Sequence, residues 1–240
     1  MIRVSGLFKA FNSQKILDNI SFEIKDGEIA VLLGASGAGK SVLLKTLMGL
    51  TKPEQGTVEI GGQDITQLAE KDLLPIRKKI GYMFQEGALY DFMNVAENVG
   101  FPLREHTNWD ADTISKKVSE TLGLVGLEAA GGKYPSELSG GMKKRVGLAR
   151  AIILGSKVLF CDEPTSGLDP IRSREITDLI RNIARKLHCT TIITSHDINN
   201  SFRIADKILL IRDGKILAFG TPAQLKASQE TFVREFVGAF

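Results

Sequence analysis

The segment that most constrains this chain is Gly34–Ser41, which reads GASGAGKS and matches the pattern GxxxxGK[ST]. The apolar run Ile29–Leu33 precedes it, as is typical of a strand that is buried on both faces of a parallel sheet. Apolar residues at helical spacing follow it over Val42–Met48. This order of strand, glycine-rich turn and helix predicts a phosphate-binding P-loop and disfavours a chance match.

The residues of this loop have separate expected roles. We expect Gly34, Gly37 and Gly39 to adopt positive φ and to turn backbone N–H groups toward phosphate. Lys40 is expected to reach the β- and γ-phosphates, and the Ser41 hydroxyl is expected to bind Mg²⁺. The residues expected to contact the nucleotide here are Gly34, Ala35, Ser36, Gly37, Ala38, Gly39, Lys40, Ser41 and Val42.

Two adjacent carboxylates, Asp162 and Glu163, follow a second apolar run at Val158–Cys161. By itself such a pair is more often a solvated turn at a strand end. Beside a P-loop the catalytic interpretation is favoured, with Asp162 holding Mg²⁺ through water and Glu163 polarising the attacking water.

His196 follows a third strand-like run, Thr191–Thr194. A lone histidine is more often structural than catalytic. The carboxyl edge of a parallel sheet is, however, where such sheets bind ligands, so we expect His196 to hydrogen-bond the γ-phosphate. His106 and His188 have no comparable context and are expected on the surface.

Composition narrows the class of protein. The 240 residues carry a net charge of +3 from 31 basic and 28 acidic side chains, which is too balanced to favour nucleic acid as the main partner. The two cysteines, Cys161 and Cys189, lie in or beside apolar runs and are expected to be buried, reduced thiols of a cytosolic protein. No run reaches the roughly 18 apolar residues of a membrane helix, so another chain would have to cross any membrane.

The order of the expected elements predicts the fold class. Ile2–Leu7, Ile20–Ile24 and Thr57–Ile60 are typical of an antiparallel β subdomain. Strands that alternate with helices indicate a parallel α/β core, and the helical texture of 86–150 indicates an inserted helical subdomain. We therefore expect an α/β protein with a P-loop NTPase (RecA-like) core.

A further motif, Leu138–Met142, reads LSGGM and opens a helix. Ser139 is a good N-cap, and Gly140 and Gly141 leave backbone amides open to an anion. A simple capped helix with a solvated Lys/Arg face is the plainer alternative. With this motif upstream of the strand that ends at Asp162, the sequence resembles the ATP-binding-cassette (ABC) ATPases, whose signature loop is close to LSGGQ.

The resemblance covers residues 1–220 and implies the roles of further residues. It implies that Phe11 stacks on adenine, that Gln85 is the Q-loop glutamine and that Asp169 belongs to the D-loop. It also implies a head-to-tail homodimer in which the signature loop of one copy closes over ATP held by the other. The implied catalytic residues are Glu163, His196 and Gln85, the implied Mg²⁺ ligands are Ser41, Gln85 and Asp162, and the signature loop adds Ser139, Gly140 and Gly141 to the ATP contacts.

On this resemblance the chain is a single ABC ATPase domain over 1–240. Its core and β subdomain are expected at 1–85 and 156–220, the helical subdomain at 86–155 and a C-terminal helical tail at 221–240. Thr221, Pro222 and Gln224 have the pattern of a capped helix start. The tail carries an apolar stripe, and whether the stripe docks on its own subunit or on the partner is left open; its residues are Phe232, Val233, Phe236 and Val237.

The region 86–105 corresponds to the groove that receives a helix of the membrane permease in ABC transporters. Its amino-acid sequence, together with Met142 in place of glutamine, is similar to that of the ATPases of MCE-type (Mla) phospholipid transporters. The implied partners are a second copy, a transmembrane permease and an MCE-domain protein, with no nucleic acid. The implied location is peripheral, at the cytoplasmic face of the inner (plasma) membrane. The alternatives are a transporter of another substrate (amino acid, lipoprotein or drug) and a soluble non-transport ABC ATPase.

Overall fold

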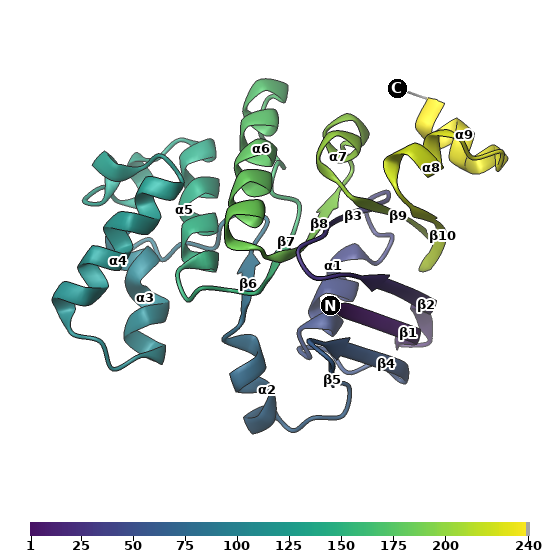
Figure 1. The fold of residues 1–240 in the computed structure, drawn as a ribbon, viewed down its shortest axis with the longest axis horizontal. Coiled ribbons are helices and arrows are strands. Elements are labelled where there is room, and N and C mark those ends of the chain that lie inside the picture. Colours follow the sequence, from purple (N-terminus) through teal and green to yellow (C-terminus); the bar gives the residue numbers. More distant parts are fainter. Residues whose placement is uncertain (239–240) are drawn as a thin grey trace. The chain divides into compact units, whose positions relative to one another are not determined.

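The computed structural model describes residues 1–238 and divides the chain into two compact units, whose elements are labelled in Figure 1. The first unit contains Met1–Pro75 and Thr190–Phe240, and the second contains Ile76–Cys189. The expected mixture of strands and helices is present in both units. The subdomain boundaries expected at 85/86, 155/156 and 220/221 stay a prediction.

The first unit begins with an antiparallel sheet in the order β2-β1-β4-β5. Asn12 and Ser13 both have positive φ, so a two-residue turn joins β1 to β2 and continues the ladder to its tip. The first two strands are therefore longer than the sequence predicts. The bounds are Ile2–Phe11 for β1, Gln14–Ile24 for β2, Gln55–Ile60 for β4 and Gln63–Asp64 for β5.

The same unit contains the strand that leads to the P-loop. β3 (Ile29–Leu33) is entirely buried and pairs in parallel with β8 (Thr190–Ser195) and β9 (Lys207–Arg212). β10 (Lys215–Gly220) pairs antiparallel with β9. The helices α1 (Lys40–Leu47) and α7 (Ile198–Ile204) follow β3 and β8 directly. The expected parallel arrangement is confirmed here.

The second unit has two parallel strands and a group of helices. β6 (Ile80–Met83) pairs with β7 (Val158–Cys161). Figure 1 shows α3, α4 and α5 side by side, and they contact one another. The bounds are Val95–His106 for α3, Ala111–Leu124 for α4, Gly140–Ile152 for α5 and Pro170–Leu187 for α6, with short 3₁₀ turns at Glu128–Ala130 and Pro135–Glu137. The boundary between the two units in the sequence, between Pro75 and Ile76, falls within α2 (Glu70–Arg77).

The C-terminal segment forms two helices in the first unit. α8 (Pro222–Lys226) starts as expected, because the Thr221 hydroxyl accepts a hydrogen bond from the Gln224 N–H and the Gln224 side-chain oxygen accepts one from the Thr221 N–H. α9 (Thr231–Gly238) buries Val233 and places the Phe232 ring 5.2 Å from the Arg212 guanidinium. The stripe thus lies against its own unit; the Val237 side chain and positions 239–240 lie outside the described part.

Both cysteines are buried, as expected. Burial raises the pKa of both thiols, which keeps them protonated and unreactive. His106 and His188 are exposed, also as expected. Over residues 1–238, none of the helices combines the length and apolar character needed to cross a membrane.

Candidate nucleotide-binding site

The P-loop connects β3 to α1 within the first unit. Gly37 and Gly39 have φ of 80° and 98°, a region that L side chains rarely adopt, so glycine is required at both positions. Gly39 is also the N-cap of α1 and offers no side chain to cap it. The first turn of α1 therefore has no side-chain cap at the end where a phosphate would bind.

The expectation for Gly34 is wrong in its physical reason. Gly34 does not have positive φ. A Cβ at this position would instead lie 2.5 Å from the Ile211 carbonyl oxygen and 2.7 Å from the Ile211 Cγ2. Glycine is required here because β9 passes too close to the start of the loop for any side chain.

Lys40 is folded back on its own loop. Its Nζ donates hydrogen bonds to the carbonyl oxygens of Gly34, at 2.8 Å, and Ala35, at 3.1 Å. These bonds hold the ammonium group inside the P-loop, where a phosphate is expected. Because the lysine already satisfies these carbonyls, binding of nucleotide would exchange bonds to carbonyl oxygens for bonds to phosphate oxygens.

His196 lies beside the P-loop within the first unit. Leu33 at the end of β3 is in register with Ser195 at the end of β8, so Gly34 and His196 follow neighbouring strand ends. His196 is exposed. The Ser195 hydroxyl accepts a hydrogen bond from the Asp197 N–H at 2.9 Å, which fixes the backbone turn around His196. The register supports the expected proximity of His196 to a bound phosphate.

A cavity of about 370 Å³ adjoins the P-loop on the side of α9. It lies within the first unit and opens next to the segment expected to bind phosphate. Its lining consists of Ala35, Ser36, Gly37, Ala38, Ile211, Arg212, Asp213, Phe232 and Phe236.

Phe11 ends β1 and precedes the hairpin turn. Its ring is 46% exposed, and the Lys9 ammonium lies 4.9 Å from the ring centroid. Lys9 in turn forms an ion pair with Glu54 at 2.6 Å. An exposed aromatic ring held at a strand end fits the expected contact with adenine.

In the second unit, the expected Mg²⁺ ligands Gln85 and Asp162 follow two paired strands. Met83 of β6 is in register with Cys161 of β7, so the two segments leave the same edge. Asp162 is buried and accepts a hydrogen bond from the Tyr82 hydroxyl at 3.1 Å. This hydrogen bond orients the carboxylate, and Tyr82 is a functional candidate that the sequence reasoning missed.

The candidate base, Glu163, has φ of 43°. A left-handed conformation is unfavourable for a residue with a Cβ and is found mainly where function requires it. The conformation turns the chain sharply between Asp162 and Pro164. The special geometry is consistent with the catalytic role expected for Glu163.

Mg²⁺ prefers oxygen ligands, and the expected set fits this preference. Asp162 offers a carboxylate, Ser41 a hydroxyl and Gln85 an amide oxygen. Ser41 belongs to the first unit, whereas Asp162 and Gln85 belong to the second. When bound, the ion would neutralise charge on the phosphates.

The signature loop is arranged as expected. Ser139 is the N-cap of α5 and accepts a hydrogen bond from the Met142 N–H at 3.3 Å. Its hydroxyl hydrogen can therefore point away from the helix toward an anion. Gly140 and Gly141 form the first turn of α5, where the helix dipole favours negative charge.

Asp169 is the N-cap of α6. Its carboxylate accepts hydrogen bonds from the N–H groups of Ile171 and Arg172, each at 3.0 Å. The Arg172 N–H lowers the pKa of Asp169 most, which keeps the carboxylate charged. The described structure therefore gives Asp169 a helix-capping role, and its contact with nucleotide stays a prediction.

Lys144 is a second residue that the sequence reasoning missed. It lies in α5, is 6% exposed, and donates hydrogen bonds to the Gln85 carbonyl oxygen and to the Ser166 hydroxyl. Burial lowers its pKa, an effect that the carboxylates of Glu86 and Glu163 oppose. The only sequence signal is its place in the Lys143–Arg145 run, for which a solvated face was the plainer alternative and no specific role was predicted.

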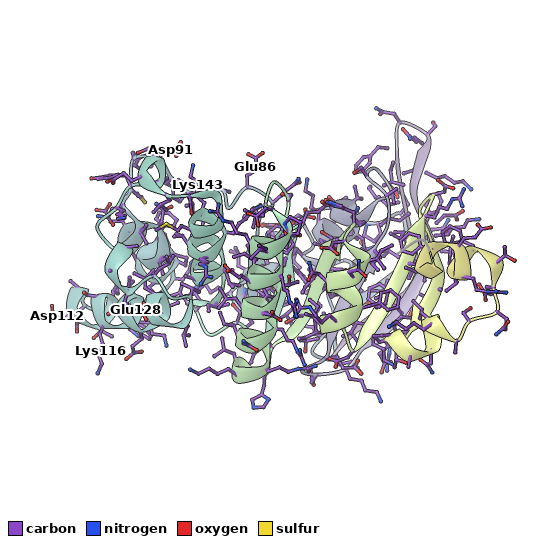
Figure 2. All side chains as sticks on the ribbon, turned by 90° about the horizontal axis from the view of Figure 1, so that it is seen from above. Glu86, Asp91, Asp112, Lys116, Glu128 and Lys143 are labelled. Carbon is purple, nitrogen blue, oxygen red and sulfur yellow. The ribbon has the colours of Figure 1, made fainter. Side chains whose placement is uncertain are left out.

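The segment expected to receive a permease helix carries a cluster of three aromatic rings, Tyr90, Phe92 and Phe101. The buried Asn98 holds the segment in place, because its side chain accepts from the Tyr90 N–H and donates to the carbonyls of Tyr90 and Met93. Phe92 is 76% exposed. Figure 2 shows Glu86 and Asp91, two residues of this segment, projecting outward.

Comparison with known proteins agrees with these features. The sequence pattern of the family described as ABC transporter matches residues 17–166. A probable ribonucleotide transport ATP-binding protein, mkl, of Mycobacterium tuberculosis is 44% identical over 98% of this chain, and the chain spans 66% of that protein's length.

Two further relatives are named for the transport of different substrates. The intermembrane phospholipid transport system ATP-binding protein MlaF of Haemophilus influenzae is 41% identical over 99% of this chain and 90% of that protein. The methionine import ATP-binding protein MetN of Carboxydothermus hydrogenoformans is 45% identical over 86% of this chain and 61% of that protein.

Among solved structures, the dimeric post-hydrolysis state of the ATP-binding cassette MJ0796 bound to ADP and Pi is similar to this chain. The TM-score is 0.85 at 29% identity, with 92% of this chain and 99% of that chain covered. The similarity extends over nearly the whole chain, including both compact units.

Proposed function

The chain belongs to the ABC transporter family, and on that basis we propose that it is the ATP-hydrolysing subunit of a phospholipid transporter of the MCE (Mla) type. The family and the similarity to a cassette with bound ADP and Pi establish ATP binding and hydrolysis. The phospholipid and the membrane partners are the parts that we propose.

The observation that carries the proposal is the match to the phospholipid transport protein taken together with the residues at 86–105 and Met142, because a sulfate/thiosulfate import protein of Chlorella vulgaris is also matched, at 39% identity, over 99% of this chain and 98% of its own length. The phospholipid relative is matched over 99% of this chain and 90% of its own length. The ribonucleotide and methionine relatives are slightly more identical, but the chain covers only 66% and 61% of their lengths. The amino-acid sequence of 86–105 and Met142 in the signature loop support the phospholipid assignment.

We assign hydrolysis to residues of both units. The P-loop amides and Lys40 bind the β- and γ-phosphates, and Glu163 accepts the proton of the attacking water. Gln85 and His196 orient the water and the γ-phosphate. Ser41, Asp162 and Gln85 would hold Mg²⁺, which would supply positive charge near the phosphates.

The second half of each nucleotide site comes from a second copy. The Ser139 hydroxyl and the amides of Gly140 and Gly141 would bind the γ-phosphate of ATP held by the partner's P-loop. The dimeric state of the similar cassette supports this pairing. Two sites per homodimer follow from such a head-to-tail arrangement.

The dimer would act through a permease that docks near 86–105. A cytoplasmic helix with apolar side chains would fit the aromatic cluster, where Phe92 is largely exposed. The permease would join the ATPase to an MCE-domain protein. This places the chain peripherally, at the cytoplasmic face of the inner (plasma) membrane.

Reconstitution tests the function. The chain is co-purified with its permease and MCE-domain protein, inserted in proteoliposomes, and supplied with a fluorescent phospholipid and ATP. We expect ATP-dependent movement of the phospholipid, which stops in a complex that carries Glu163→Gln. Glu163→Gln is the matched control because it removes turnover and leaves the complex assembled.

The main alternative is a transporter of another substrate, and the methionine import relative makes methionine the specific candidate. ATPase activity of the complex is measured with added methionine and with added phospholipid. Stimulation by methionine alone, without movement of phospholipid, would contradict the lipid assignment. Recovery of the chain with ribosomes or DNA and without a permease would contradict transport altogether.

A further inference from the structure

Lys144 is unusual because a charged side chain is almost completely buried within the second unit. It is 6% exposed and uses its ammonium group to join two other segments. One hydrogen bond reaches the Gln85 carbonyl oxygen, and another reaches the Ser166 hydroxyl at 3.2 Å. A buried ammonium is costly unless hydrogen bonds and opposite charges compensate it, so this arrangement is specific.

Two carboxylates, those of Glu86 and Glu163, interact electrostatically with the Lys144 ammonium group. Glu86 follows Gln85, and Glu163 is the proposed base; both favour the charged form of Lys144. Ser166 lies between Glu163 and Asp169. One ammonium group therefore links α5 to the Q-loop and to the segment that follows β7.

Two other contacts bind α5 to the Q-loop. The Arg150 guanidinium donates a hydrogen bond to the Gly87 carbonyl oxygen at 2.7 Å. A Cβ on Gly147 would lie 3.2 Å from the Gly87 Cα, so the helix and the loop backbone are in close contact. These contacts place the backbone of the Q-loop directly against α5.

The start of α5 is the signature loop, which in the proposed dimer serves ATP on the partner. Gln85 and Glu163 serve ATP on the same chain. We propose that Lys144 is a positioning residue that couples the two nucleotide sites of the dimer by linking α5 to its own Q-loop and to the segment that follows β7. This inference rests on the proposed head-to-tail dimer.

The mechanism requires no chemistry at Lys144. When ATP engages Gln85, the Q-loop and the segment containing Ser166 settle in one arrangement, and the ammonium holds α5 in register with both. Ser139–Gly141 are then placed to close on the partner's ATP. Loss of the link would leave each site able to bind ATP but unable to respond to the other.

The test uses Lys144→Met, Lys144→Arg and the matched control Lys143→Met in the complete transporter complex. Lys143 is the neighbouring lysine of α5, labelled in Figure 2, and is only partly buried. Each complex is assayed for affinity for a fluorescent ATP analogue, kcat, KM and the Hill coefficient of ATP hydrolysis. Melting temperature is measured on the same samples.

For Lys144→Met we expect ATP affinity within about twofold of wild type, kcat lower by about tenfold or more, and a Hill coefficient that falls toward 1. Lys144→Arg keeps charge and donors and is expected to restore much of the cooperativity. Lys143→Met should match wild type. If Lys144→Met lowers the yield of folded complex, Lys144→Leu, which also has no donor group, replaces it with the same expectations.

Wild-type cooperativity in Lys144→Met or in its Leu replacement, or equal losses in Lys144→Arg and Lys144→Met, would overturn the proposal. A wild-type Hill coefficient of 1 would also overturn it. ATP-dependent dimerisation of Glu163→Gln, followed by size-exclusion chromatography with light scattering, separates the two claims. No dimer would reject the proposed function itself, whereas a dimer with an unaltered Lys144→Met would reject only the coupling role.

Discussion

The two compact units hold their candidate functional groups in different ways. In the first unit the P-loop depends on backbone geometry: glycines with positive φ, a close approach to Ile211, and a lysine bound to loop carbonyls. In the second unit Asp162 and the Q-loop are held by side chains, Tyr82 and Lys144. We expect the P-loop of the first unit to act mainly in nucleotide binding and Glu163 of the second unit mainly in hydrolysis, to which His196 of the first unit also contributes.

The largest expected effect tests the second unit. Glu163→Gln removes the proposed base while keeping the size of the side chain, so kcat should fall by about 100-fold or more. ATP affinity should stay near the wild-type value, and ATP-bound dimers should accumulate. Phosphate release and binding of a fluorescent ATP analogue measure the two effects. Near-normal hydrolysis would remove Glu163 from the assignment.

A smaller effect is expected in the first unit, on ATP affinity instead of on kcat. Lys40→Ala removes an ammonium group that would bind two phosphates, so ATP affinity should weaken by about tenfold or more, since each charged hydrogen bond contributes on the order of 1.5–3 kcal/mol. Equilibrium binding measures the loss. Lys45→Ala, a change of an exposed lysine on the same helix, is the control. Equal affinity in Lys40→Ala and wild type would break the division between binding and turnover.

The next prediction concerns the backbone of the P-loop. Gly34→Ala would bring a Cβ within 2.5 Å of the Ile211 carbonyl, so β9 or the loop must shift. We expect a loss of about 1–3 kcal/mol in the free energy of unfolding, as for other overpacked sites. Gly132→Ala is the control, because nothing lies within 4 Å of its Cβ position. Equal melting temperatures would show that the approach of β9 is not limiting.

The smallest expected effect is on pH dependence. Burial raises the pKa of Cys161 and of Tyr82 in the second unit. As pH rises above the ordinary thiol value of 9.0, the unfolded chain loses protons that the folded chain keeps, so stability falls with pH. The slope should be at most about 1.4 kcal/mol per pH unit for each group. Urea unfolding between pH 7 and 10 measures it, and Cys161→Ala should reduce the slope.

Much of the fold was predictable because short apolar runs and turn residues are local signals. Ile29–Leu33 matches β3 and Val158–Cys161 matches β7 without change. β10 was not predicted, although Asp213 and Gly214 both have positive φ and form the type of turn that an Asp-Gly pair predicts. That signal was present in the sequence and was overlooked.

The site was predictable only where a motif carries the information. The P-loop, Asp162 and the capping role of Ser139 follow from residue type and spacing. The contacts of Tyr82 with Asp162 and of Lys144 with Gln85 join residues 80 and 59 positions apart, and nothing local specifies them. The true reason for Gly34 is likewise a long-range one, since Ile211 belongs to a distant strand.

Because Glu163 has a left-handed backbone, substitutions there should affect cellular abundance and transport-dependent growth differently. A glycine would adopt this conformation without the roughly 1 kcal/mol that a residue with a Cβ loses there. In a mutational survey scored by cellular abundance, position 163 would therefore tolerate glycine well, whereas the same survey scored by growth on transport would reject it. Abundance and fitness would diverge most sharply at the residue where the chain turns over its ATP.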